Sequence, residues 1–458
     1  MELLFSGSDI GATDHSDHDT AVARSALCKV IAMASLVLAI ANPAAGGLYS
    51  GPNDDPDNGF DAGVPGFVGP HGDGKARLTQ SEGIFINPEN RVNHLFCGWA
   101  DEVVHYLPSP NVALGWSDHS MSLGPVQGEY FDIVSLGDLN ANQMTNRINP
   151  GSITLSFFKP LQDKTGADLA VFENSIVSQG GSGIAGQPFA ELAYVEISSD
   201  GEVFARFPSR FLTTEPVGSF GTIDASNIFG LAGKHANANG LSWGTPFDFA
   251  ALKDDPAVIS GQIKLNAITH VRVVDIPGNG AYRDTIGAPI YDAWETSVSG
   301  GFDLEAVGVI GRDTSFSEWQ NLHGLPESSL GELADSDEDG RTDLLEYAAG
   351  HSPQSPDGFT DAQRFSMIGG LPALTVRRDE RAVDLVLEIE TSSDLLSWAV
   401  IARSTDGNPF QAVPPHAPQV TETRAPGPAS VGVIREATII ARTGSARQGF
   451  MRLSVRHK

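Results

Sequence analysis

The chain is poor in cysteine, which limits how its fold can be stabilised. Among 458 residues only Cys28 and Cys97 are cysteines, and Cys28 lies in a segment that we expect to be removed. No disulfide framework can therefore form. Cys97, in the stretch HLFCGWADEVV, is expected to be a single buried thiol. Stability must come from core packing, with bound metal as a further source.

Basic residues are also scarce. The sequence has 29 Lys and Arg against 57 Asp and Glu, which gives a formal net charge of −28 and a pI near 4.6. A surface of this charge repels a phosphate backbone. We therefore expect no nucleic-acid partner and regard anionic membranes as poor partners, which leaves divalent cations and neutral glycans.

Motifs that identify two common enzyme classes are missing. The sequence contains no H-E-x-x-H and no complete G-x-x-x-x-G-K-[ST] segment, and its 12 histidines are scattered without close metal-ligand spacing. Whether the protein is an enzyme is uncertain on these grounds, and the sequence favours a protein that is not one.

Only one long apolar run occurs, Val30–Ile40, and it follows Lys29 and precedes a series of small residues. This pattern is typical of a signal peptide and is too short for a stable membrane span. A buried helix is the alternative. We expect a secreted or cell-surface protein without a transmembrane anchor.

Short strand patterns dominate the rest of the chain. Between 151 and 310 the segments SITLSFF, DLAVFEN, LAYVEISSD, EVFARFP, ITHVRVVDI and GFDLEAVGVI are β-branched or aromatic runs bounded by turn residues. They predict a mainly β fold with a jelly-roll-like sandwich. By contrast, the apolar spacing of three and four in NRVNHLFCGWADEVVHYLP predicts a short amphipathic helix.

Composition shifts divide the chain into five parts. We expect an N-terminal extension with the signal peptide, a jelly-roll-like main domain, a helix-loop-helix unit, a Pro- and Ser-containing linker, and a small β-sandwich. These parts span 1–46, 47–311, 312–352, 353–363 and 364–458, respectively.

The segment ADSDEDGRTDLLEY has the spacing of an EF-hand calcium loop. If Asp335 is position one, acidic residues occupy positions three, five, nine and twelve, and glycine occupies position six. Calcium prefers such hard oxygen ligands, and the glycine permits the left-handed turn around the ion. A solvated acidic turn is the alternative. The expected Ca²⁺ ligands are Asp335, Asp337, Asp339, Arg341 through its carbonyl, Asp343 and Glu346.

Helices are expected on both sides of this loop. Leu344, Leu345 and Tyr347 begin the second helix, and its apolar face is expected to pack against Trp319 and Leu322 of the first. No second such loop exists in the sequence, so we expect a structural clip between domains and not a regulatory sensor.

The segments CGWADEVVHYLP, GADLAVFENS, ELAYVEISSDGEVFARFP and GGFDLEAVGVI resemble a family of bacterial secreted cell-surface proteins. That family has no settled biochemical activity. The acidic loop is similar to EF-hand and dockerin loops. Together with the strand pattern after it, it resembles the C-terminal arrangement of exported proteins from Verrucomicrobia-type bacteria.

The segment VEISSDGEVFARFP is also similar to a hairpin of discoidin-like and galactose-binding-like jelly rolls. The resemblance implies that Asp200 and Gly201 form the turn, that Phe204 packs inward, and that a ligand binds at loops on one end of the sandwich.

Acidic residues at strand ends form a second set of candidates. They can coordinate another calcium, or two of Glu173, Glu191, Asp275 and Asp303 can act as acid and base in polysaccharide hydrolysis. The third interpretation, which we favour, is that they cap turns. The full set is Glu173, Asn174, Glu191, Asp275, Asp303 and Glu305.

Loop aromatics complete the functional expectation. Trp116, Trp243, Tyr282, Tyr291 and Trp294 lie in polar loops and can stack on sugar rings or anchor the loops. We expect a calcium-binding adhesion protein with a glycan or surface polymer as ligand. An extracellular polysaccharide hydrolase and a structural spacer are the alternatives.

Overall fold

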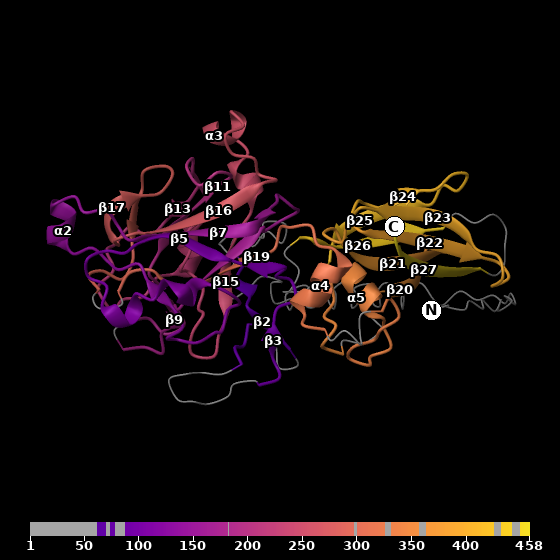
Figure 1. The fold of residues 1–458 in the computed structure, drawn as a ribbon, viewed down its shortest axis with the longest axis horizontal. Helices are drawn as coiled ribbons and strands as arrows, with labels where there is room; N and C mark the ends of the chain where they lie inside the picture. The colour runs from indigo at the N-terminus through magenta and orange to yellow at the C-terminus, as the bar shows by residue number, and fades with distance from the viewer. Residues whose placement is uncertain are drawn as a thin grey trace, which may run out of the picture.

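The protein consists of two β-rich bodies that lie side by side along its long axis (Figure 1). Nearly all of its strand pairs are antiparallel, and the helices are short. The fold class predicted from the sequence is thus confirmed. The computed structural model describes residues 62–69, 74–77, 88–181, 183–296, 300–325, 331–356, 363–425, 432–441 and 449–458. The expected signal peptide and Cys28 lie outside these residues.

One sheet of the main body holds the strands that carry several candidate residues. Its order is β1-β15-β8-β19-β4, and β6 also pairs with β19. The central pair brings Leu304 of β19 opposite Glu173 of β8. The strands are β1 (Val64–Pro65), β15 (Trp243–Phe247), β8 (Leu169–Glu173), β19 (Asp303–Val309), β4 (Gly98–Trp99) and β6 (Val134–Ser135).

A second sheet, of order β12-β11-β16-β7-β5, faces the first across the main core. Its inward side chains alternate with outward ones, as in β11, where Val195 and Ile197 enter the core. Glu196, between them, instead pairs with Arg206 and Arg272 on the other face. The strands are β12 (Ala205–Arg206), β11 (Ala193–Ser198), β16 (Ile268–Asp275), β7 (Ser152–Leu161) and β5 (Glu102–Leu107).

Short elements fill the loops of this sandwich. The helical turns are η1 (Leu114–Trp116), η2 (His119–Ser122), α2 (Ala141–Thr145), η3 (Ala225–Asn227), η4 (Phe249–Leu252) and α3 (Pro256–Ile259). The small strand pairs are β2 (Phe67–Val68) with β3 (Arg91–Val92), β9 (Ile176–Val177) with β10 (Pro188–Phe189), β13 (Arg210–Phe211) with β14 (Ile228–Phe229), and β17 (Asn279–Arg283) with β18 (Pro289–Tyr291).

Two sequence expectations for this body are wrong. The segment expected to form an amphipathic helix contains β3, β4 and β5, because β5 pairs along β7 and β4 pairs with β19. This pairing overrides the local periodicity. Phe204 does not pack inward. It lies half-buried beneath the guanidinium of Arg272, 3.8 Å from the ring centre, and its neighbour Ala205 enters the core instead.

The second body is a sandwich of two four-stranded sheets. One has the order β20-β21-β26-β25 and the other β24-β23-β22-β27. The strands are β20 (Gln363–Ile368), β21 (Leu371–Asp379), β26 (Ile434–Ile440), β25 (Gln419–Arg424), β24 (Gln411–Ala412), β23 (Ala399–Thr405), β22 (Leu385–Ser392) and β27 (Phe450–His457).

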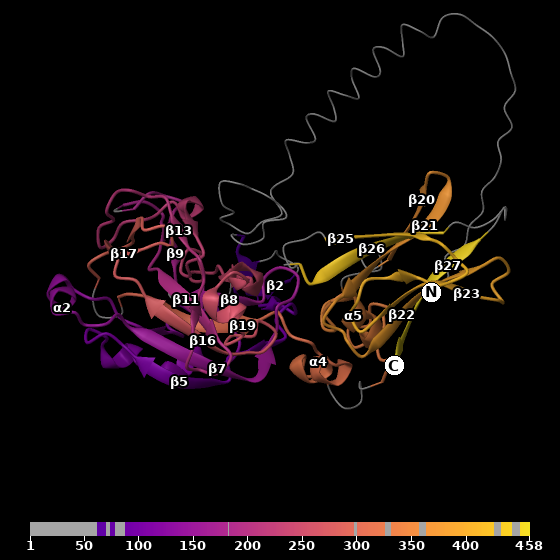
Figure 2. The same cartoon turned by 90° about the horizontal axis from the view of Figure 1, so that it is seen from above.

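Two helices, α4 (Phe316–Leu322) and α5 (Asp343–Ala349), pack on this second sandwich. Phe316 and Tyr347 join the hydrophobic core that the two sheets form. Ser315 starts α4 with a reciprocal capping pair to Glu318, which fixes where the helix begins. Figures 1 and 2 show α4 beside the boundary between the two bodies.

The two bodies share buried contacts at that boundary. Arg381, 5% exposed, pairs with Asp379 and donates to the carbonyl oxygens of Leu95 and Ile310 in the main body. Ile434 of β26 packs in one apolar cluster with main-body side chains. The contact therefore joins polar and apolar groups of both bodies.

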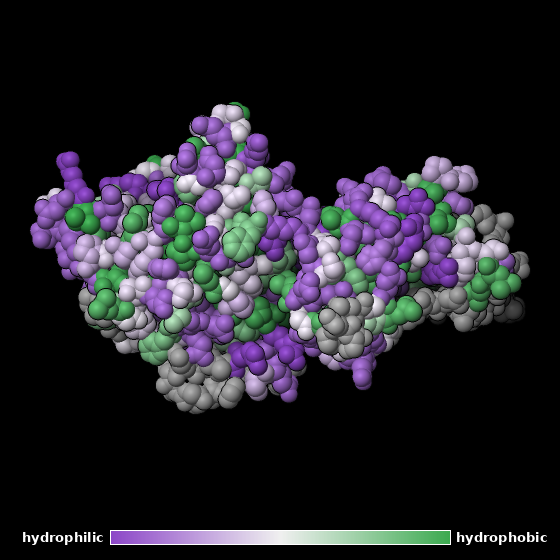
Figure 3. Space-filling model, in the orientation of Figure 1, coloured by the Kyte–Doolittle hydropathy of each residue, from purple (hydrophilic) through white to green (hydrophobic). Residues whose placement is uncertain are grey.

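The visible surface is largely polar, with hydrophobic residues in small separate patches (Figure 3). None of the helices in the described part of the chain has the length and apolar character needed to cross a bilayer. Cys97 is a free, buried thiol, as the sequence predicts.

Candidate metal centre

Three acidic side chains of the predicted calcium loop converge in the structure. Asp335, Asp337 and Asp339 each offer a carboxylate oxygen, and these oxygens lie within 4.8 Å of one another. Two oxygens bound to one calcium at about 2.4 Å are at most about 5 Å apart. The spacing of the three groups therefore suits a shared ion.

Backbone amides hold the loop in this shape. The amide of Gly340 donates to Asp335 Oδ2 at 2.9 Å, and the amide of Arg341 donates to Asp339 Oδ1 at 2.8 Å. Gly340 has φ of +92°, the left-handed conformation that position six requires. Glu338 also has a positive φ, +61°. The chain thus curls around the three carboxylates.

The other three predicted ligands occupy different settings. Asp343 accepts hydrogen bonds from both the amide and the hydroxyl of Ser336, at 2.9 and 2.7 Å, and so holds the start of the loop against the start of α5. Glu346 is fully buried on α5, and the side chain of Arg341 is 2% exposed and reaches His351. Neither Asp343 nor Glu346 belongs to the group of carboxylate oxygens within 4.8 Å.

The helices that flank the loop pack largely as expected. The rings of Trp319 and Tyr347 lie 5.6 Å apart, and Leu344 joins their cluster. Leu322, expected in this contact, is 40% exposed, since Phe316 occupies the centre instead.

The main-body carboxylates gather at one end of the sandwich, where β8, β16 and β19 begin or end. Glu173 and Asp275 end β8 and β16, Asp303 starts β19, and Glu191 precedes β11. All four are at least 93% buried. Asn174, beside them, donates to the carbonyl oxygen of Tyr130 at 3.1 Å.

Burial is the main cause of the raised pKa values of these groups. It raises the pKa of Asp303 and of Glu305 to about 8 in each case. Burial, followed by the neighbouring charge of Asp303, also raises the pKa of Glu173 and Glu191 well above the ordinary range. The pKa of Asp275 is also raised, mainly by burial and then by the neighbouring charge of Asp138.

Sequence reasoning missed two buried members of this group, Asp138 and Asp292. Burial is the main cause that raises the pKa of both, to about 6 for Asp138. Asp138 follows a short strand by three residues and Asp292 directly follows β18, so the strand-end pattern that identified the others was available for them.

Another acidic triplet, Asp163, Asp168 and Asp248, was also missed. Its oxygens lie within 4.8 Å of one another. Asp168 accepts the backbone amides of Lys164 and Phe249, and Asp248 accepts that of Ala250. Two of the three carboxylates therefore satisfy loop amides, which is the turn-capping role expected of such residues.

The loop aromatics separate into exposed and buried sets. Trp116 is half-buried and its ring lies 5.6 Å from that of Phe131, which is 49% exposed and contacts Tyr130. Trp243, expected to be exposed, is buried because it packs on Gly74. Trp294 anchors a loop by donating Nε1 to the Leu139 carbonyl, and Tyr282 and Tyr291 pack against a small core.

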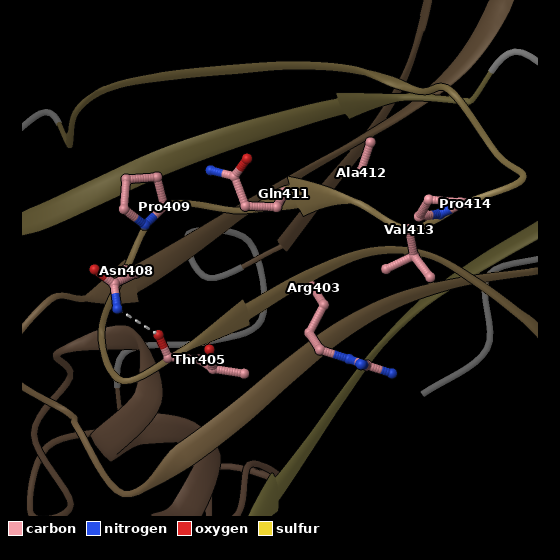
Figure 4. A pocket seen from close by; sticks show the side chains of 8 residues that line it. All are labelled: Arg403, Thr405, Asn408, Pro409, Gln411, Ala412, Val413 and Pro414. Carbon is pink, nitrogen blue, oxygen red and sulfur yellow. Dashed lines mark hydrogen bonds between the residues drawn. The ribbon is translucent and has the colours of Figure 1, made fainter.

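Two shallow grooves lie away from the acidic residues of the loop. One, of about 590 Å³, lies between β23 and the segment after it (Figure 4) and has no carboxylate in its lining. The other, of about 690 Å³, lies on the outer face of the second main-body sheet beside Glu196, Arg206 and Arg272. Neither groove is lined by the carboxylates at the strand ends.

Comparison of the chain with family models, curated proteins and solved structures found no match. Function must therefore be argued from the geometry of the sites.

Proposed function

We propose that this is an exported calcium-binding protein of the bacterial cell surface or matrix, with a noncatalytic role in binding glycan. The calcium part rests on one observation: Asp335, Asp337 and Asp339 have EF-hand spacing and bring their oxygens within 4.8 Å of one another. Because the flanking helices belong to the core of the second sandwich, bound calcium would stabilise that body.

Burial of the main-body carboxylates favours binding over hydrolysis. A glycosidase needs two carboxyl groups on either side of a substrate in an accessible cleft. Glu173, Glu191, Asp275 and Asp303 are each 7% exposed or less, so a polysaccharide cannot reach them in this conformation.

The aromatic cluster of Trp116, Tyr130 and Phe131 supports glycan as the ligand class. It combines a half-buried indole with an exposed phenylalanine ring, and such apolar faces stack on sugar rings. Leu114, 94% exposed, extends the apolar surface beside Trp116.

The calcium assignment predicts one saturable site that depends on the loop. After chelator treatment, calorimetric titration should detect calcium binding, and calcium should raise the melting temperature. In D335A/E346A the loop site should be lost, because the change removes the first and twelfth positions of the loop.

Glu338→Gln is the matched control for that experiment. Glu338 is exposed within the same loop but does not occupy a ligand position, so the variant loses a charge and should keep the site. Equal calcium affinity in D335A/E346A and the parent protein would refute the assignment.

The glycan assignment predicts that W116A/F131A binds polysaccharide at least about tenfold more weakly, since it removes two stacking rings. Affinity electrophoresis in gels containing xylan, β-glucan, chitin derivatives or pullulan measures this directly. Phe158→Ala removes a ring that is 80% exposed on β7 and should leave retardation unchanged. If no polysaccharide retards the parent protein, the spacer interpretation replaces this one.

A further inference from the structure

Five buried carboxylates of the main body share a hydrogen-bonding pattern. One oxygen of each accepts a backbone amide at 2.8 to 3.0 Å, which fixes the orientation of the group. The pairs are Glu173 with Ser175, Glu191 with Gly301, Asp275 with Phe302, Asp292 with Leu192, and Asp138 with Thr296.

The second oxygen of two of these groups is left without a donor. Asp275 Oδ2 and Asp138 Oδ1 are fully buried and receive no hydrogen bond from the described residues, and the same holds for Asp303 Oδ1. An orphaned buried carboxylate oxygen is costly and requires an explanation.

The residues on either side of Asp303 connect it to the other acids. Gly301 and Phe302, which precede it, donate their amides to Glu191 and Asp275, respectively. Leu304, which follows it, lies opposite Glu173 in the sheet. Carboxylates that hold a metal are commonly fixed through their other oxygen by hydrogen bonds, as these are. Buried ionised groups are otherwise paired with an opposite charge or become protonated.

We propose that a hard divalent cation of the calcium type binds among Glu173, Glu191 and Asp303, at the end of the main sandwich. The donors are carboxylate oxygens only, which suit calcium and not softer metals. Asp275, whose free oxygen is also buried, supplies a fourth anionic group beside Asp303.

This site differs in kind from the acidic loop. Its oxygens do not form a group of three within 4.8 Å, as those of the loop do. Calcium takes six to eight oxygen ligands and accepts water among them, so fewer direct carboxylate bonds are sufficient. An ion at this site would offset the repulsion between several buried carboxylates. An ion in the acidic loop would bind the less buried carboxylates of the loop instead.

The site is connected to the proposed glycan surface through Asn174 and Tyr130. The pKa of Tyr130 is raised by burial and then by the charges of Asp303, Glu191 and Glu173. The carbonyl of Tyr130 accepts the side chain of Asn174, which directly follows Glu173. A bound cation would therefore rigidify the segment that carries Tyr130 and Phe131.

The test uses the D335A/E346A protein, in which the loop site is removed. After chelation it should still bind calcium with a dissociation constant of about 1 mM or tighter, and terbium should bind with luminescence sensitised by Tyr130 and Tyr106. Adding D303N or E173Q should weaken both signals about tenfold or more.

Glu202→Gln is the control, because Glu202 is exposed and follows the end of β11 that is opposite to Glu191 and Asp275. Melting in chelator checks the fold of each variant, and E173Q decides the matter if D303N does not fold. No saturable binding in D335A/E346A, or binding that D303N and E173Q leave unchanged, overturns the proposal; protons would then neutralise the cluster. A failure of the loop assignment would appear separately, as binding unaffected by D335A/E346A.

Discussion

Replacing Arg381 with methionine should lower the free energy of unfolding by about 3–5 kcal/mol. Its guanidinium is buried against Asp379 at 2.6 Å, and it also donates to the carbonyl oxygens of Leu95 and Ile310 across the boundary. Methionine fills similar volume but leaves Asp379 as a buried, uncompensated charge. Denaturant unfolding followed by tryptophan fluorescence measures the loss.

Two further variants show where that effect comes from. R456M removes an arginine whose side chain is 53% exposed and pairs with Glu388 only at 3.8 Å, so it should change stability by less than about 0.5 kcal/mol. R381M/D379N removes both partners of the buried pair and should recover part of the loss. A loss below about 1 kcal/mol in R381M would contradict the role given to this contact.

Replacing Phe172 with alanine (F172A) should lower the free energy of unfolding by about 3–5 kcal/mol. Phe172 is fully buried in β8, and its ring lies 5.7 Å from that of Phe96 and 6.1 Å from that of Trp99. A Cβ at Gly244 would come within 2.8 Å of the ring, so the glycine lets the neighbouring strand approach closely. Thermal and urea unfolding at one pH measure the cost.

Phe158→Ala is the reference for this truncation. It removes the same atoms from a side chain that is 80% exposed on β7, so little apolar burial is lost. Similar losses in F172A and F158A would show that the ring at 172 is not part of a close-packed core.

The strands were predictable because their signals are local. Alternation in LAYVEISSD and the apolar run in DLAVFEN correspond to β11 and β8, with turn residues at their ends. The error between 90 and 106 has a physical origin. Val92, Trp99 and Tyr106 have helical spacing, but the pairing of β5 with β7 decides the structure, and nothing in that window encodes its partner.

The two candidate metal sites differ in predictability for the same reason. All positions of the loop fall within twelve residues, so spacing alone identified them. The buried cluster joins segments around 138, 173, 191, 275, 292 and 303, and only the sheet order brings them together. The sequence marked four of these acids at strand ends but could not show that they are buried.

This contrast bears on how each site can be inherited. The loop and its two helices are one continuous piece, so recombination can move the site into another protein whose surface accepts α4 and α5. The carboxylate cluster has no such portable form, because each acid arrives on a different strand end or loop. It can be transferred only with the whole sandwich, and it can be lost through a change in any one of those segments.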